Sequence, residues 1–189
     1  KPQMLTETAS HTAATATEWA LTCRLCGSAK LRSFLDLGAT PPCELFLPAE
    51  ALERPEMTYP LHVRVCESCL LAQLPPLITP EETFTEYAYF SSFSTSWVEH
   101  ARRFVDGAVE RLGLGPDSFV VEVASNDGYL LQHVVARGAR CLGIEPSVNV
   151  GEAARGKGVP TVTAFLTPES GAQVRAEHGP ADLVCLNNV

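Results

Sequence analysis

Short apolar runs alternate with amphipathic stretches through the second half of the chain. Residues 120–123 form a β-branched run, and small or turn-forming residues follow before helical periodicity begins at Leu130. Three more apolar runs predict further strands, at residues 140–145, 159–164 and 181–186. A helix is predicted to start after Thr167, where a cap residue, a proline and an acid follow one another. This alternation predicts an α/β fold with a Rossmann-like sheet over residues 115–189.

Residues 81–114 are predicted to be a linker and a helix in front of this sheet. Segment 86–97 is rich in aromatic and hydroxyl side chains, and the helix after it has Ser94 or Ser96 as a cap. The apolar stripe of the helix consists of Trp97, Ala101, Phe104, Val105, Ala108 and Leu112. The spacing favours packing at the domain junction for four aromatic residues, Tyr87, Tyr89, Phe90 and Phe93. The alternative is that hydroxyl groups of this segment hold a cofactor carboxylate or a substrate oxygen.

The first half of the chain contains two matched cysteine pairs. Cys23 and Cys26 form one CxxC pair, Cys66 and Cys69 form the other, and each pair can place two thiolates on one metal ion. Together they predict a tetrahedral, structural zinc site in a small domain over residues 21–80. The gap between the pairs leaves room for two strands, at residues 31–37 and 61–65. The alternatives are a redox dithiol, which occurs as a single pair, and two disulfides, which suit an oxidising compartment.

Composition limits the function without identifying it. The hydrophobic fraction of 46% and the charged fraction of 19% are those of an ordinary soluble protein, and no apolar run is long enough to span a bilayer. We therefore expect a cytoplasmic location and no membrane partner. A net charge of -8 argues against a nucleic-acid partner, because phosphate binding requires a basic face. Residues 1–20 lack periodicity and are expected to form a flexible tail.

The turn after residues 120–123 indicates the type of cofactor. In doubly wound sheets, a nucleotide-containing cofactor binds where a strand gives way to a helix. A dinucleotide fingerprint needs glycine at its first two positions so that the backbone can approach a pyrophosphate, but Ala124 and Asn126 occupy them here. The pattern instead resembles the acid-x-Gly-x-Gly-x-Gly turn of S-adenosylmethionine (SAM) methyltransferases, with Gly128 kept. Asn126 tolerates the left-handed backbone that such a turn can require.

Other residues follow at the intervals expected for a SAM site. Glu145 ends the second predicted strand, where its carboxylate can accept hydrogen bonds from both ribose hydroxyls. Apolar side chains around Phe165 offer a surface for an adenine ring, and Asn187 follows the fourth strand. The predicted cofactor-binding residues of this half are Glu122, Ala124, Asn126, Gly128, Tyr129, Leu130, Glu145, Pro146, Phe165 and Asn187.

Seven motifs occur in one order along residues 22–189: CRLCGS, LDLGATPP, CESCLLAQL, YAYFSSFSTSW, VEVASNDGYLLQ, GIEPSVNV and LNNV. Together they resemble the SAM-dependent sugar C-methyltransferases of deoxysugar biosynthesis. The resemblance implies a zinc-binding N-terminal domain, a class I methyltransferase domain and a C-terminal domain that helps to hold a nucleotide-linked 4-keto sugar. It also implies that Ser91 and Ser92 face the methionine end of the cofactor.

The chemistry implied by this resemblance is methylation of the carbon next to a ketone. A base removes the proton beside the carbonyl, hydrogen bonds stabilise the enolate, and the enolate carbon attacks the methyl group of SAM. Tyr87 and Tyr89 match tyrosines that the family contributes to its catalytic site. The family base is a histidine after the fourth strand, so we expect it beyond Val189. None of the histidines present has a convincing case as that base: His11, His62, His100, His133 and His178.

The family sheet has seven strands, whereas this sequence ends after the fourth. We therefore expect a sheet truncated after strand four, in a fragment or first segment of a longer chain. Three other functions stay open: an RNA or other small-molecule methyltransferase with a zinc module, a non-catalytic zinc-mediated interaction module, and a nicotinamide oxidoreductase. The last is the weakest, because the turn lacks the glycines that a pyrophosphate needs. The pattern specifies no oligomeric state.

Overall fold

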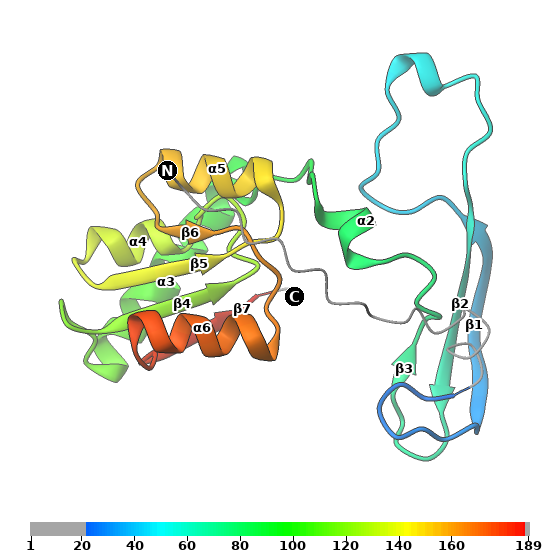
Figure 1. The fold of residues 1–189 in the computed structure, drawn as a ribbon, viewed down its shortest axis with the longest axis horizontal. Helices are drawn as coiled ribbons and strands as arrows, with labels where there is room; N and C mark the ends of the chain where they lie inside the picture. The colour runs from blue at the N-terminus through cyan, green and yellow to red at the C-terminus, as the bar shows by residue number, and fades with distance from the viewer. Residues whose placement is uncertain (1–21, 188–189) are drawn as a thin grey trace. The chain divides into compact units, whose positions relative to one another are not determined.

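The computed structural model describes residues 22–187, so the predicted tail at residues 1–20 lies outside the described part of the chain. The chain divides into two compact units. The first comprises Lys1–Cys43 and Pro48–Thr79, and the second comprises Glu44–Leu47 and Pro80–Val189. Each unit has its own sheet (Figure 1). Within residues 22–187, no helix has the length and apolar character that a membrane crossing requires.

The first unit is built on an antiparallel sheet with the order β1-β2-β3. Its elements are β1 (Leu31–Thr40), the short 3-10 helix η1 (Ala49–Ala51), β2 (Tyr59–Cys66) and β3 (Ala72–Gln73). The two predicted strands of this unit are confirmed, but β1 is longer than expected. Gly38, with a φ of 77°, forms an irregularity within the strand, and its N–H donates to the Asp36 carboxylate at 2.9 Å. The chain therefore continues as a strand beyond a glycine that would otherwise end it.

The second unit contains a four-stranded parallel sheet with the order β6-β5-β4-β7. The strands are β4 (Phe119–Val123), β5 (Arg140–Ile144), β6 (Thr161–Val162) and β7 (Leu183–Leu186). This order, with β4 central, confirms the predicted Rossmann-like fold class. The third predicted strand is shorter than expected, because within residues 159–164 only Thr161 and Val162 pair with β5.

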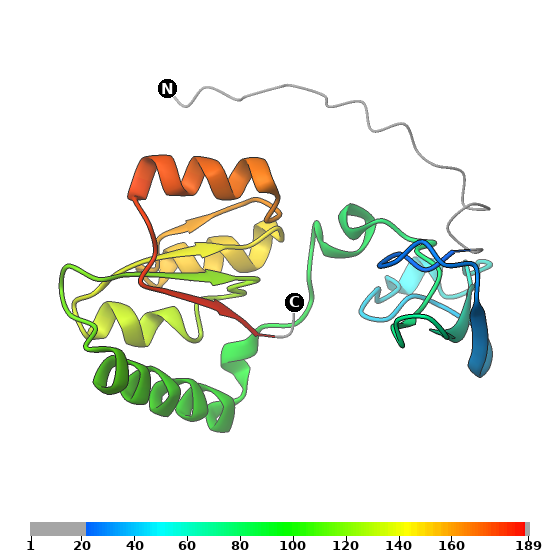
Figure 2. The ribbon, with the colours of Figure 1, turned by 90° about the horizontal axis from the view of Figure 1, so that it is seen from below.

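Helices cover both faces of the parallel sheet. The helices of the second unit are, in chain order, α2 (Pro80–Phe84), the 3-10 helix η2 (Ser91–Phe93), α3 (Thr95–Leu112), α4 (Leu131–Ala136), α5 (Val148–Gly156) and α6 (Pro168–His178). α6 lies on one face of the sheet, and α3 and α4 lie on the other (Figure 2). The side chains of β4 alternate accordingly: Val120 joins the core with α3, α4 and α5, whereas Phe119 and Val121 join the core on the α6 face.

The predicted helix starts carry the expected caps. The Ser94 hydroxyl caps α3 by accepting from the Trp97 N–H at 3.3 Å, while Ser96 lies inside the helix. Thr167 and Ser170 form a capping box at the start of α6, with a proline in its first turn. Local side-chain chemistry thus fixes where both helices begin.

Candidate functional site

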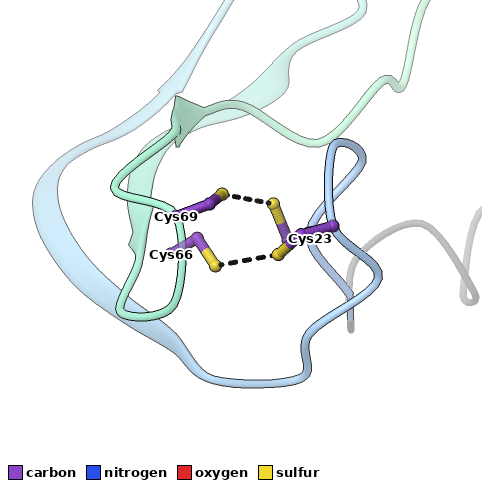
Figure 3. Close-up of side chains that lie close together, drawn as sticks. Cys23, Cys66 and Cys69 are labelled. Carbon is purple, nitrogen blue, oxygen red and sulfur yellow. Dashed lines mark hydrogen bonds between the residues drawn. The ribbon is translucent and has the colours of Figure 1, made fainter.

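Four cysteines form a candidate metal centre in the first unit. The sulfur atoms of Cys23, Cys26, Cys66 and Cys69 all lie within 4.8 Å of one another. Cys23 Sγ is 3.5 Å from Cys69 Sγ (Figure 3). Cys26 Sγ is 3.6 Å from Cys66 Sγ, so each close pair takes one sulfur from each CxxC segment. Thiolates about 2.3 Å from a tetrahedral zinc ion lie about 3.8 Å from one another, whereas a disulfide bond is about 2.0 Å long. The geometry therefore fits a four-thiolate zinc centre and not two disulfides.

The two CxxC segments share one backbone pattern. In each, the residue after the second cysteine is left-handed: Gly27 has a φ of 72° and Leu70 a φ of 65°. The N–H of this residue donates to the carbonyl of the first cysteine at 2.8 Å, in Cys23 and in Cys66 alike. This repeated turn lets a four-residue segment present two thiols to one point.

Backbone N–H groups favour the thiolate form of Cys66 in the second CxxC segment. Burial opposes ionisation of Cys66, but the N–H groups of Cys69 and Ser68 outweigh it and lower the pKa of the Cys66 thiol to about 6. In the first segment, the Arg24 N–H donates to the Gln73 side-chain oxygen at 3.1 Å and so ties that segment to β3. With four thiolates the centre has no open coordination position, which is typical of a structural zinc site.

A second candidate site lies in the second unit, at the carboxyl ends of the parallel strands. It is a cavity of about 420 Å³, within the size range of small-molecule sites. Ten of the predicted site residues line it: Tyr87, Tyr89, Ser91, Ala124, Asn126, Tyr129, Glu145, Pro146, Phe165 and Asn187. Four do not: Ser92, Glu122, Gly128 and Leu130. The cavity thus gathers residues from five segments that are far apart in the sequence.

The turn between β4 and α4 has a left-handed residue at each position of the glycine pattern. Ala124 and Asn126 have φ values of 52° and 50°, and Gly128 has a φ of 76°. A Cβ atom on Gly128 would lie 3.0 Å from Val159 Cγ2, so this glycine also allows close packing. Leu130, two residues after Gly128, is buried in the core with α3 and α4. Gly128 and Leu130 therefore support the turn by packing on the side away from the cavity, and neither residue lines it.

Glu145 holds this turn and lines the cavity at the same time. Its Oε2 accepts from the Asn126 N–H at 2.7 Å, and its Oε1 accepts from the Ser147 N–H at 2.9 Å. Each carboxylate oxygen keeps a further lone pair. Glu145 can therefore accept ligand hydroxyls without releasing the turn.

Glu122 lies below the turn. Strand alternation directs its side chain to the same face as Val120, where it is 0% exposed and neither carboxylate oxygen has a hydrogen-bond partner among residues 22–187. Burial, together with the nearby charges of Glu145 and Asp127, raises the pKa of Glu122 to about 8. The carboxyl group is therefore largely protonated at neutral pH.

Residues 85–93, named the strap below, bring the predicted tyrosines to the cavity. Asn126 holds the second half of the strap: its Oδ1 accepts from the Ser91 N–H at 2.9 Å, and its Nδ2 donates to the Tyr89 carbonyl at 3.0 Å. The ring of Tyr89 meets the ring of Tyr87 edge to face, with centroids 6.4 Å apart. The strap is thus attached to the turn by its backbone and presents its aromatic side chains to the cavity.

Ser92 does not line the cavity and lies beside the ion pair of Asp127 and Lys157. Its hydroxyl donates to the Asp127 carboxylate, and Lys157 Nζ lies 2.8 Å from both Ser92 Oγ and Asp127 Oδ2. Asp127 is buried, whereas Lys157 is partly exposed. This cluster ties the strap to the turn and to the end of α5.

Residues that the sequence did not single out as site residues also line the cavity. Trp97, predicted only as part of a helix stripe, stacks on Tyr129 with ring centroids 5.9 Å apart. Phe84 ends the short α2, and its ring packs against Tyr87 at 5.6 Å. Ser147 follows Glu145 along the wall. Only Trp97 gave a sequence signal, as an aromatic residue at the junction of the strap and the helix.

The cavity is aromatic and acidic. Within residues 22–187, no lysine, arginine or histidine lines it, whereas the carboxylate of Glu145 does. The described histidines are therefore not among the residues that line the cavity. A group with positive charge is better matched to such a surface than a phosphate is.

Comparisons with known proteins identify relatives of the chain. Residues 23–84 match the family model described as "Putative zinc binding domain", a range that includes all four cysteines of the metal centre. The chain is also 36% identical, over 162 residues, to the "C-methyltransferase NovU" of Streptomyces niveus. That match covers 86% of this chain and 39% of the relative, so the chain spans about two-fifths of the relative's length. Both relationships support the resemblance to C-methyltransferases that the motifs of the chain indicate.

Proposed function

We propose that the second unit binds SAM in the cavity at the carboxyl ends of its strands. The observation that carries the proposal is the position of Glu145, at the end of β5, on the cavity wall and bonded to the left-handed turn. The remaining lone pairs of its two oxygens suit the two hydroxyls of a ribose. Phe165 and Leu166 offer an apolar surface for the adenine ring on the same cavity.

The charges of the site favour a sulfonium cofactor over a dinucleotide. A cation above an aromatic ring gains about 0.5 to 2 kcal/mol, and the rings of Trp97 and Tyr129 line the cavity. A pyrophosphate would instead find no compensating cation among the lining residues described. The charges of the site therefore argue against the nicotinamide alternative.

We further propose that the whole protein methylates a carbon next to the ketone of a nucleotide-linked 4-keto deoxysugar. The name of the relative, a C-methyltransferase, supports carbon as the acceptor, and the motif resemblance supports the sugar. Bound SAM would supply a methyl group on a positively charged sulfur. Tyr87 and Tyr89 line the cavity, where their hydroxyls would donate to an enolate oxygen. The zinc centre would hold the first unit together and take no part in the transfer.

Calorimetric titration of the full natural chain with SAM, and with NAD as a control, tests the cofactor. We expect saturable binding of SAM and none of NAD. Glu145→Ala should weaken SAM binding at least about tenfold, because it removes the acceptors for the ribose. Glu152→Ala, which changes an exposed acid on α5, should leave SAM affinity unchanged. Equal SAM affinity in folded wild type and Glu145→Ala would contradict the assignment, and tight NAD binding would favour the oxidoreductase.

A product assay with isotope-labelled SAM, read by mass spectrometry or NMR, tests which atom accepts the methyl group. SAM with a labelled methyl group is incubated with the full natural chain and nucleotide-linked 4-keto sugars. We expect the label on a carbon of the sugar. Label on oxygen, nitrogen or RNA would overturn the substrate proposal while leaving the SAM proposal intact.

A further inference from the structure

An asparagine outside the predicted site holds the first half of the strap. Asn149, in the first turn of α5, accepts a hydrogen bond from the Tyr87 N–H at 3.0 Å through Oδ1. Its Nδ2 donates to the carbonyl of the same residue at 2.7 Å. The side chain therefore satisfies both backbone polar groups of Tyr87, as a neighbouring strand would.

The start of α5 is shaped to receive the strap. Ser147 precedes the helix but makes no side-chain cap hydrogen bond, so the first helical N–H groups need other acceptors. The Val148 N–H donates to the Thr85 carbonyl at 3.1 Å. Two successive residues of α5, Val148 and Asn149, thus bond to two alternate residues of the strap. The strap therefore provides an N-terminal cap for α5, and its backbone pairs with Val148 and Asn149 much as one strand pairs with another.

Only a side-chain amide fits the Asn149 position fully. An aspartate would accept from the Tyr87 N–H, but its second oxygen would face the Tyr87 carbonyl without a proton to donate. An alanine would leave both groups of Tyr87 without this partner. The same logic holds at Asn126, which bonds to the Tyr89 carbonyl and the Ser91 N–H. Two amides therefore fix the strap on either side of its two tyrosines.

We propose that Asn149 is a positioning residue for the cavity: by holding both backbone groups of Tyr87, it fixes the strap as one wall of the site. Tyr87, Tyr89 and Ser91 all line the cavity, and the two tyrosine rings pack on each other. Movement of the Tyr87 backbone would therefore displace both rings from the ligand. The inference rests on the proposed function for the identity of the ligand, whereas attachment of the strap is a property of the chain alone.

Hydrogen exchange of the strap, read by mass spectrometry on the full natural chain, tests the attachment. Asn149→Ala should speed exchange of the Tyr87 amide roughly 10- to 30-fold, because two backbone hydrogen bonds are lost. Asn149→Asp keeps the acceptor and should give an intermediate rate. Gln132→Ala is the matched control, since it removes an amide hydrogen bond to the Tyr129 carbonyl at 2.8 Å outside the strap. It should leave exchange of residues 85–91 unchanged.

SAM titration of the same variants tests the positioning role. If the strap is less firmly attached, a smaller fraction of the protein is in the binding-competent state. SAM affinity should therefore fall in Asn149→Ala, by a factor no larger than the increase in the exchange rate of the strap. The thermal midpoint of the chain should change little. Unchanged strap exchange would overturn the inference, and so would faster exchange with unchanged SAM affinity. Absence of SAM binding by wild type would count against the proposed function, while exchange would still decide whether Asn149 holds the strap. If Asn149→Ala does not fold, Asn149→Asp decides by the same two measurements.

Discussion

Glu122 should make the stability of the second unit depend on pH. Its side chain is 0% exposed, its carboxylate oxygens have no hydrogen-bond partner among the described residues, and burial raises its pKa from 4.5 to about 8. Between these two pH values, the native unit keeps a proton that the unfolded chain releases. The free energy of unfolding therefore falls as the pH rises through this window.

The size of the effect follows from the width of the window. Each pH unit costs about 1.4 kcal/mol, so Glu122 removes roughly 3 kcal/mol of stability by pH 7 relative to pH 4.5. Glutamine resembles a protonated carboxyl group in shape and does not titrate. Glu122→Gln should therefore have nearly the stability of wild type close to pH 5 and exceed it by roughly 3 kcal/mol at pH 7. A constant offset from the buried amide would leave this difference in slope unchanged.

Urea unfolding between about pH 5 and pH 8, followed by tryptophan fluorescence, measures this slope. The chain has two tryptophans, and a Trp19→Phe background leaves Trp97 as the reporter of the second unit. Subtracting the wild-type curve from the variant curve cancels titration of all other groups, the metal-centre thiols included. Parallel curves for wild type and Glu122→Gln would refute the reasoning, because they would mean that Glu122 has the same pKa in the folded unit as in the unfolded chain.

Three further substitutions test other features of the chain. Cys66→Ser should lower bound zinc from about one equivalent to below about half in metal analysis, while exposed Cys43→Ser should retain it; equal zinc contents would count against the four-thiolate centre. Ala124→Gly should raise stability by about 0.5 to 1 kcal/mol in thermal unfolding, because Ala124 has a φ of 52°; a lower midpoint would mean that the turn is not strained there. Lys157→Met should lower stability by about 2 kcal/mol in urea, since it leaves buried Asp127 without its cation; an unchanged midpoint would contradict that pairing.

The fold could be predicted where its signals are local. β-branched runs fixed the strands of the parallel sheet, and the caps Ser94 and Thr167 fixed the starts of two helices. β3, with two residues, and α2, with five, were missed because elements that short carry no periodicity. They form where longer elements supply partners: β3 exists because Arg64 and Val65 of β2 pair with it.

The sequence predicted most residues of the candidate site, but it predicted less well the direction in which their side chains point. The positions of Glu145, Phe165 and Asn187 at strand ends could be read from spacing, and all three line the cavity. Glu122 precedes the turn by the expected number of residues, yet strand alternation turns its side chain under α4 instead of toward the cavity. Trp97 had the spacing of a core residue, but it lies in the first turn of α3, where the helix reaches the cavity beside Tyr129. Sequence spacing gives the register of an element and not the direction from which its neighbours approach.

Asn126 explains why this turn departs from the glycine pattern without losing its shape. Glycine would accept the φ of 50° at lower cost, but it would leave the Ser91 N–H and the Tyr89 carbonyl without their side-chain partner. Asparagine is among the few other residues that tolerate this conformation, and its amide matches one backbone donor and one backbone acceptor. The same amide chemistry recurs at Asn149, which bonds to Tyr87. Asn126 therefore replaces one of the glycines that a pyrophosphate needs and also helps to attach the strap, so this residue links the shape of the cofactor turn to the position of the tyrosine wall.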